Sequence, residues 1–452
     1  MKSLVRSPRG SLWLLQFSAW VRRQQLLRAV YGLLPTRLRR KVAGSLVSQA
    51  GDGIRFQRTS AWNKIDRQSA VPSKQAPTLS SPGVNIVGYI HGQFGLAEAA
   101  RLYARALIEA GIAVSLHDVD LNLPHGRDDE TVREWIDETL PHDVTIVFVN
   151  PDFLQAALEK IGRSKLAGHH IIACWFWELE EIPEAWMDSL EYVDEIMVAT
   201  DFIANAFRRV TKKPVLLVPL PISAVPDSNL QRADFGLEQD KFIFLTSFDF
   251  HSSIGRKNPY AVVEAFLRAF PVGDDRVRLL VKTSHGLNYP EKLQALLERA
   301  ATDPRILVRD DILDRADINA LQRCCDAYVS LHRAEGFGLG LAECMALGKP
   351  VIATAWSGNL DFMDRETACL VDYRLVKVKD GEYPHPAGAV WAEASIRSAC
   401  EAMRQLANDP AGARQLGERA RYAVRKTLSP ERTAHLISER LMQLKRSRSG
   451  AV

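Results

Sequence analysis

The chain has 452 residues, a length that suits two or three domains with large hydrophobic cores. It is 46% hydrophobic and 25% charged, as is usual for soluble α/β proteins, and it contains no low-complexity tract. With 58 basic against 54 acidic residues, the overall charge gives no indication of a nucleic-acid partner, and no apolar run is long enough to span a bilayer.

The cysteines indicate a reducing compartment. None forms a C-x-x-C pair and several lie in apolar runs, which predicts reduced core thiols in a cytoplasmic protein. Residues 11–20 resemble a short signal-peptide core, but a small-residue cleavage site is missing and Arg22-Arg23 follow directly, so we expect no export. The cysteines are Cys174, Cys324, Cys325, Cys344, Cys369 and Cys400.

Residues 1–80 are expected to form an extension outside the catalytic domains. Residues 1–50 carry ten basic side chains and no acidic one, and apolar residues between Trp13 and Leu34 recur at near-helical spacing. A basic amphipathic helix with tryptophans suits an anionic membrane, here the inner face of the cytoplasmic membrane. The alternative is a helix packed on the enzyme itself or on a second subunit. Residues 52–82, rich in Ser, Pro, Gln and Lys, predict a linker.

A first folded domain is predicted over residues 81–225. It opens with a buried strand at 84–90, which leads into His91 and then a turn with Gly92 and Gly95 before a helix. Apolar strands then alternate with helical patterns, as in a doubly wound parallel sheet. We expect the further strands at 114–116, 144–149, 171–175, 195–199 and 215–219.

Two features of this domain are candidate sites. Glu178 ends the run Cys174-Trp-Phe-Trp-Glu178 at the carboxyl end of a strand, where open α/β sheets bind ligands. It is a candidate for binding the acceptor substrate, and the aromatic residues before it suit either stacking on a sugar ring or core packing. Asp118-Val-Asp120 is a D-x-D triplet, but it lies early in the domain at a strand end, so we favour an ordinary structural role and expect no metal.

A second domain is predicted over residues 226–429, after a stiff linker at 219–226 that contains three prolines. Arg256 and Lys257 precede Asn-Pro at the start of a helix, where a cation opposes the helix dipole unless an anion is bound. Fixed cations there would stabilise the growing negative charge of a departing phosphate.

The most informative stretch is residues 330–360, SLHRAEGFGLGLAECMALGKPVIATAWSGNL. A buried strand precedes it, glycines open the mouth of a helix, and a second strand follows. A helix mouth of this kind favours an anionic ligand through its free N–H groups and the helix dipole. Two carboxylates lie in the unit, Glu335 in the loop and Glu343 on the helix, with seven residues between them.

This stretch resembles the E-x7-E signature of the group 1 (family 4) retaining glycosyltransferases. That resemblance implies the GT-B fold: two Rossmann-like doubly wound domains that face a central cleft, with residues 430–452 as a terminal helix that crosses back to the first domain. It also implies that Glu335 contacts the hydroxyls of the donor sugar, with Arg256 and Lys257 completing the catalytic group. Glu343 would contact the ribose. The other donor-binding candidates by resemblance are Gly336, Phe337, Gly338, Leu339, Gly95 and Arg309, and the substrate-binding candidates are His91, Glu178 and Asn359.

The implied reaction is transfer of a sugar from a nucleotide diphosphate to a hydroxyl of a glycan or a lipid-linked acceptor, with retention of configuration. The motifs are similar to those of bacterial mannosyltransferases of surface-polysaccharide assembly, including lipopolysaccharide. This favours GDP-mannose as the donor, with a UDP-sugar as the main rival and no separate cofactor. The alternatives are a nucleotide-sugar epimerase of the same fold and a non-catalytic sugar-binding partner of an assembly complex.

Overall fold

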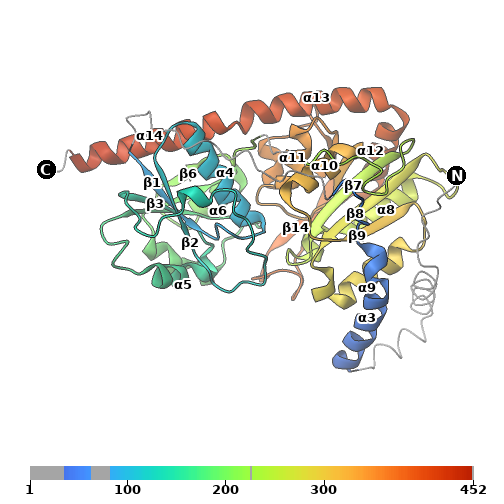
Figure 1. The fold of residues 1–452 in the computed structure, drawn as a ribbon, viewed down its shortest axis with the longest axis horizontal. Coiled ribbons are helices and arrows are strands. Elements are labelled where there is room, and N and C mark those ends of the chain that lie inside the picture. Colours follow the sequence, from blue (N-terminus) through green and yellow to red (C-terminus); the bar gives the residue numbers. More distant parts are fainter. Residues whose placement is uncertain (1–34, 63–81, 224–226, 450–452) are drawn as a thin grey trace.

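The computed structural model describes residues 35–62, 82–223 and 227–449. Two six-stranded sheets, parallel throughout, form the centres of two domains that lie side by side, as Figure 1 shows. Their strands are short and almost entirely buried because helices cover both faces, which is the usual environment of a parallel sheet. The α/β class and the two Rossmann-like domains predicted from the sequence are confirmed.

The first domain has the strand order β2-β1-β3-β4-β5-β6. The strands begin and end where Val- and Ile-rich runs do, and α4 opens directly after the glycine turn that follows β1. The elements are β1 Val84–Gly88, α4 Gly95–Glu109, β2 Val114–Asp118, η2 Arg133–Trp135, β3 Val144–Phe148, α5 Pro151–Ile161, β4 His170–Cys174, η3 Glu184–Tyr192, β5 Glu195–Val198, α6 Asp201–Arg208 and β6 Val215–Leu217.

The second domain has the strand order β12-β11-β10-β7-β8-β9. Its longest strands, β7 and β8, pair in register from Phe242 opposite Val277 to Asp249 opposite Ser284. The elements are β7 Phe242–Asp249, α7 Ile254–Lys257, α8 Pro259–Ala269, β8 Val277–Ser284, η4 Gly286–Asn288, α9 Pro290–Ala300, β9 Ile306–Asp310, α10 Arg315–Cys324, β10 Ala327–Ser330, α11 Leu339–Ala346, β11 Val351–Thr354, η5 Gly358–Asp361, β12 Cys369–Val371 and α12 Ile396–Asn408.

An antiparallel hairpin follows the second sheet. The strand that the sequence predicts at residues 367–372 is present as β12, but it is not the last one: β13 Tyr373–Lys377 follows and pairs with β14 Val390–Ala394. The connection between them, at 378–389, is rich in Gly, Pro and charged residues and gives no strand pattern of its own. The hairpin matters because this connection reaches the candidate site.

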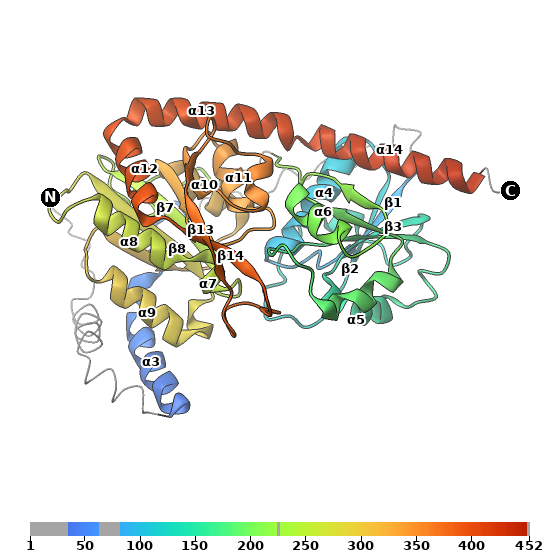
Figure 2. The same ribbon diagram turned by 180° about the vertical axis from the view of Figure 1, so that it is seen from behind.

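Two long helices close the molecule along one side. α13 Pro410–Thr427 lies on the second domain and α14 Pro430–Ser449 lies on the first, where it packs against α4, as Figure 2 shows. The chain therefore crosses between domains twice. The two crossings are adjacent, because the Ile222 N–H donates to the Leu428 carbonyl over 2.8 Å and the Thr433 hydroxyl to the Pro219 carbonyl over 2.8 Å.

The described part of the N-terminal extension packs on the second domain. α3 Thr36–Ala50 lies against α9, with Ala43 and Val47 buried, and η1 Gly51–Ile54 follows. The first part of the predicted linker is not free, since Phe56 and Trp62 are buried around Phe235. The predicted amphipathic helix between Trp13 and Leu34 lies outside the described residues. Among the described helices, none combines the length and the apolar composition needed to cross a membrane.

Arg440 on α14 provides a test of how the terminal helix is held. Its Nε donates to Glu195 over 3.0 Å, and Glu195 is almost fully buried with His170 as its other partner. Arg440→Ala should lower the free energy of unfolding of the first domain by about 2 kcal/mol, because a buried carboxylate loses its cation. Urea unfolding followed by tryptophan fluorescence measures this. Arg432→Ala, at an exposed site on the same helix, is the matched control and should change it by less than about 0.5 kcal/mol.

Candidate active site

The candidate site centres on three charges of the second domain, of which Arg256 and Glu335 are buried and Lys257 is partly buried. Arg256 and Lys257 end α7, and Glu335 lies in the loop after β10. One Glu335 oxygen accepts from the Arg256 guanidinium over 3.0 Å and the other from the Lys257 ammonium over 2.5 Å. Asn258 follows in the left-handed conformation (φ 50) and fixes the turn by donating to the Leu331 carbonyl. The predicted catalytic residues Glu335, Arg256 and Lys257 therefore lie in direct contact.

Their ionisation follows from burial and mutual attraction. Burial alone would raise the pKa of Glu335, but the charges of Lys257 and Arg256 lower it to about 2. Burial lowers the pKa of Lys257, and Glu335 opposes this shift. The pKa of Arg256 is raised, because its attraction to Glu335 and Glu178 outweighs burial. Glu335 is thus an anion at every ordinary pH.

The first domain and the hairpin complete the charge cluster. Glu178, which follows β4, lies 3.6 Å from Arg256 and accepts a short hydrogen bond from the Tyr383 hydroxyl. Tyr383 comes from the β13–β14 connection, and the Arg256 guanidinium lies 5.9 Å from the centre of its ring. The sequence analysis missed Tyr383 because the hairpin that carries it was not recognised. The aromatic run before Glu178 is core: Trp175 and Trp177 are buried.

Hydrogen bonds with the turn that follows β11 hold the loop that carries Glu335. The Glu335 N–H donates to the Ser357 hydroxyl over 2.8 Å, and Gly358 donates to the Glu335 carbonyl. Asn359, expected to bind substrate, is fully buried: its amide contacts His332, Thr354 and Met363. In this structure Asn359 exposes no surface and anchors the turn, so its expected contact with substrate stays a prediction.

Gly336 is needed for a close contact between domains. A Cβ at Gly336 would lie 2.7 Å from the Trp177 carbonyl, and one at Gly358 would lie 2.1 Å from the Gly336 carbonyl. That carbonyl also accepts from the Thr200 hydroxyl of the first domain over 2.8 Å. Both glycines therefore allow the loop to pass between neighbours that any side chain would push apart.

The mouth of α11 retains the features expected for an anion site. Gly338 precedes the helix with φ 95, and the partly exposed Leu339 and Gly340 form its first turn. The N–H groups of a first helical turn have no partner within the helix. Phe337 differs from expectation, because its side chain is buried against Phe362 and leaves only backbone for a donor.

Glu343 lies in a second ion network, which joins the two domains. Its oxygens accept from Arg315, through a short contact, and from Gln322 over 3.1 Å. Arg315 also lies 3.4 Å from Glu98 of α4 in the first domain, and Glu98 in turn pairs with Arg101. The sequence analysis missed Arg315 and Glu98, because no local pattern marks a charge whose partner is more than 200 residues away.

The remaining predicted residues lie around these networks. His91 is partly buried, with its N–H on Asp118 and its ring against the Asp129 carbonyl, and Gly95 is exposed at the start of α4. Arg309 on the edge strand β9 contacts the Val308 carbonyl, and no contact of its side chain with Glu335 or Glu343 is found among the described residues. The carboxylates of the D-x-D triplet both pair with Arg127, which agrees with a structural role.

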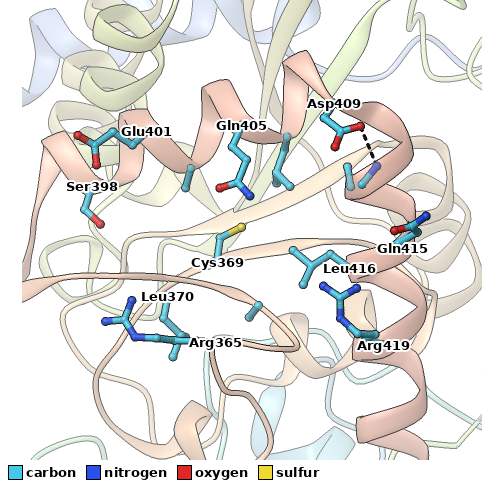
Figure 3. Close-up of a pocket in the computed structure, with 15 residues that line it drawn as sticks. Arg365, Cys369, Leu370, Ser398, Glu401, Gln405, Asp409, Gln415, Leu416 and Arg419 are labelled. Carbon is cyan, nitrogen blue, oxygen red and sulfur yellow. Dashed lines mark hydrogen bonds between the residues drawn. The ribbon is translucent and has the colours of Figure 1, made fainter.

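A pocket lies elsewhere in the second domain, and Figure 3 shows the residues that line it. It has a volume of about 430 Å³ and opens between α12, α13 and β12. Its lining includes Cys369, Gln405 and Arg419, but none of the predicted site residues. This pocket is therefore separate from the candidate active site, which is the charge cluster at the carboxyl ends of the strands of the second sheet.

Comparison with known proteins agrees with this geometry. Residues 250–378 match the family model described as glycosyl transferases group 1. HepE of Anabaena, solved with UDP and glucose, aligns with a TM-score of 0.58 at 12% identity, over 80% of this chain and 100% of that one. Sucrose-phosphate synthase of Thermosynechococcus elongatus aligns with a TM-score of 0.58 at 17% identity, over 82% and 100%. No curated protein matches the sequence.

The fold is therefore that of the GT-B proteins. The matched segment includes Arg256, Lys257, Glu335 and Glu343, so it covers the charge cluster itself. Together, the match and the fold support a glycosyltransferase of the group 1, GT-B type.

Glu335→Gln tests the ion triplet. The change leaves the buried Arg256 and the partly buried Lys257 without their anion, and we expect the free energy of unfolding to fall by about 3 kcal/mol at pH 7. A carboxylate whose folded pKa is about 2, against an ordinary 4.5, stabilises the fold above the higher value and stops doing so as the pH falls through the lower one. The difference between wild type and variant should thus be constant from about pH 8 to 5 and narrow below about 4.5.

Urea unfolding at each pH measures this difference. Glu401→Gln, which removes an exposed carboxylate paired with an exposed arginine on α12, is the control and should have little effect at any pH. A gap between wild type and Glu335→Gln that widens on acidification would contradict the assigned ion pairing.

Proposed function

We propose that this protein is a retaining glycosyltransferase that moves a sugar from a nucleotide diphosphate donor to a hydroxyl of a glycan or a lipid-linked acceptor in surface-polysaccharide assembly. The observation that carries this proposal is the contact of Glu335 with Arg256 and Lys257 beside the open mouth of α11. Such an arrangement suits a ligand with an anionic diphosphate at one end and hydroxyl groups at the other.

Binding of a donor would exchange partners within the cluster. The side chains of Arg256, Lys257, Glu335 and Glu178 carry two positive and two negative charges, so the cluster is balanced before a donor arrives. A donor phosphate would compete with Glu335 for Lys257 and free a Glu335 oxygen to accept hydrogen bonds from sugar hydroxyls. The cations would then stabilise the charge that grows on the departing diphosphate.

The ionised state of Glu335 and its contacts with two cations argue for same-face substitution. Two-step retention uses two carboxyl groups about 5 Å apart, one of them a nucleophile. Glu335 is held by two cations and its low pKa makes it a weak nucleophile, while Glu343 is engaged by Arg315 and Gln322. We therefore infer that the departing phosphate itself takes the acceptor proton, with no organic cofactor, and that positioning supplies most of the catalysis.

GDP-mannose is the donor we favour, on the resemblance of the motifs to mannosyltransferases. A UDP-sugar is the rival, because HepE, which shares the fold, was solved with UDP and glucose. Incubation with a panel of nucleotide sugars, with and without a lipid-linked acceptor, separates the possibilities. Nucleoside diphosphate released only with acceptor supports transfer, an altered sugar nucleotide supports an epimerase, and no turnover supports a non-catalytic sugar-binding partner.

Lys257→Ala should reduce turnover by about 100-fold or more, because the departing phosphate loses a fixed cation. The fold should persist, since Glu335 keeps its bond to Arg256. Steady-state release of nucleoside diphosphate, with circular dichroism on the same samples, measures both. Lys426→Ala, at an exposed site on α13, is the control and should match wild type. Near wild-type turnover in Lys257→Ala would argue against a phosphate role for Lys257.

We also propose that residues 1–50 hold the enzyme at the cytoplasmic face of the membrane. α3 packs on α9, so a truncation that begins at Pro35 keeps this contact and removes six basic residues. Because each contributes about 1 kcal/mol at an anionic surface, binding to phosphatidylserine vesicles should fall at least about tenfold. Vesicle sedimentation measures this, with phosphatidylcholine vesicles as the control. Equal vesicle binding by the full chain and the truncated form would contradict this proposal.

A further inference from the structure

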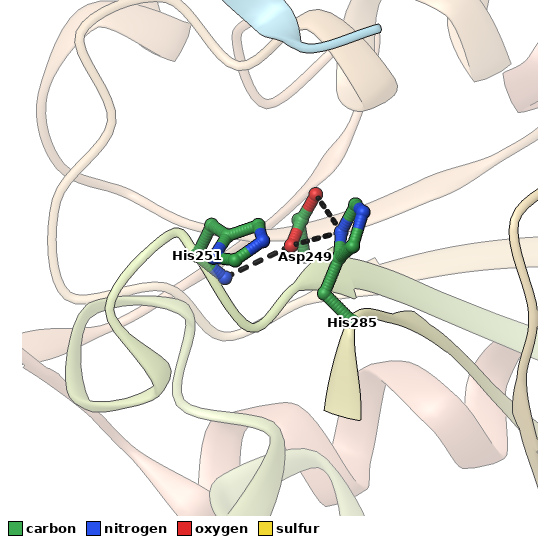
Figure 4. Close-up of side chains that lie close together, drawn as sticks. All are labelled: Asp249, His251 and His285. Carbon is green, nitrogen blue, oxygen red and sulfur yellow. Dashed lines mark hydrogen bonds and ion pairs between the residues drawn. The ribbon is translucent and has the colours of Figure 1, made fainter. Parts of the chain in front are cut away.

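Three side chains that no part of the proposed reaction uses lie close together, as Figure 4 shows: Asp249, His251 and His285. Asp249 ends β7, His251 lies two residues beyond it, and His285 directly follows β8. The strands are in register, with Asp249 opposite Ser284, so both ends deliver these side chains to one place. One ligand atom from each residue lies within 4.8 Å of the other two.

Both Asp249 oxygens are engaged, since Oδ1 also accepts from the His251 N–H over 2.9 Å, but the imidazoles keep ring nitrogens that these contacts do not use. His285 Nδ1 lies 3.0 Å from both Asp249 oxygens, so its Nε2 is not needed for that contact. His251 Nδ1 lies 3.2 Å from the Tyr289 hydroxyl. His251 Nε2 is buried and no hydrogen bond of acceptable geometry to it is found among the described residues, although the Pro124 carbonyl is near enough to favour the protonated ring.

The backbone at His285 lies in the left-handed region, with φ 60 and ψ 20. Other described residues with a Cβ share this geometry, among them Asn258 and His385. The backbone therefore places the His285 side chain but does not by itself assign it a role.

The first domain adds a third histidine beside the two imidazoles. His125 comes from the first domain: its ring centre lies 4.8 Å from that of His251, and its buried Nδ1 has no described partner.

We propose that Asp249, His251 and His285 bind one divalent transition metal of the zinc class, with an open coordination position toward His125 and the first domain. Two imidazoles and one carboxylate are a ligand set that zinc accepts, and three protein ligands leave a position open. At metal–ligand distances of about 2.0–2.1 Å, ligand atoms in tetrahedral geometry lie about 3.3 Å apart. The side chains therefore close in by rotation when the metal binds. The sequence analysis expected no metal, on the D-x-D triplet alone.

The test uses tag-free full-length protein, freed of metal with a chelator and titrated with Co²⁺ and then Zn²⁺ in the absence of any nucleotide. We expect one equivalent of Co²⁺, with visible d–d absorption typical of nitrogen and oxygen ligands, and its displacement by Zn²⁺. His285→Gly removes a ligand and relieves the positive φ, so a loss of binding in this variant cannot be attributed to misfolding. Its Co²⁺ affinity, and that of Asp249→Asn, should fall by at least about 100-fold.

His435→Ala is the control, because His435 is exposed on α14 and its described ion pair is with Glu439 on the same helix. It should bind Co²⁺ as wild type does. Lys257→Ala should also retain full binding while losing turnover, which separates failure of the metal site from failure of the proposed reaction. Wild-type protein without saturable Co²⁺ binding, or equal binding by His285→Gly, would overturn the proposal.

Discussion

The second domain depends on how it buries a carboxylate between two cations. An isolated charge in a protein interior is costly, and the cost is offset only when partners and hydrogen bonds surround it. Glu335 satisfies this condition with Arg256 on one oxygen and Lys257 on the other. Because these three side chains constrain one another, they fix the short helix α7 and the loop after β10 in a single arrangement.

The same charges link the domains. Arg256 reaches Glu178 of the first domain, and Arg315 lies between Glu343 and Glu98 in the same manner. A charged ligand can replace one partner of such an ion pair. The packing of Gly336 against Trp177 is different, because it is a fixed contact of the backbone. The interface thus combines a fixed backbone contact with polar contacts that an anionic ligand can replace.

Much of the fold was predictable because its signals are local. Val- and Ile-rich runs predicted the strands of the first domain, and the glycines before Leu339 predicted a helix mouth, since each signal depends on neighbours in sequence. The β13–β14 hairpin was not predicted, because β13 is largely exposed and lacks a run of buried residues. Tyr383 was therefore missed.

The candidate site was predictable only in part, for a related reason. The family resemblance brought Glu335, Arg256 and Lys257 to attention, and the structure places them in contact. It also assigned Asn359 and Phe337 to ligands, whereas Asn359 hydrogen-bonds within its turn and Phe337 packs in the core. A motif specifies which residues occur together but not which way each side chain points. That direction is set by partners such as Met363 and Phe362, which are not part of the motif.

The state of Glu335 limits the chemistry open to this site. A general acid must hold a proton near neutral pH, and a carboxylate nucleophile must have an oxygen that is not neutralised by neighbouring cations. Glu335 meets neither condition, because its pKa is about 2 and both of its oxygens are bonded to cations. What it can do is accept hydrogen bonds and hold two cations in place. In the proposed reaction its role is therefore one of positioning and charge, and the covalent changes take place on the substrates.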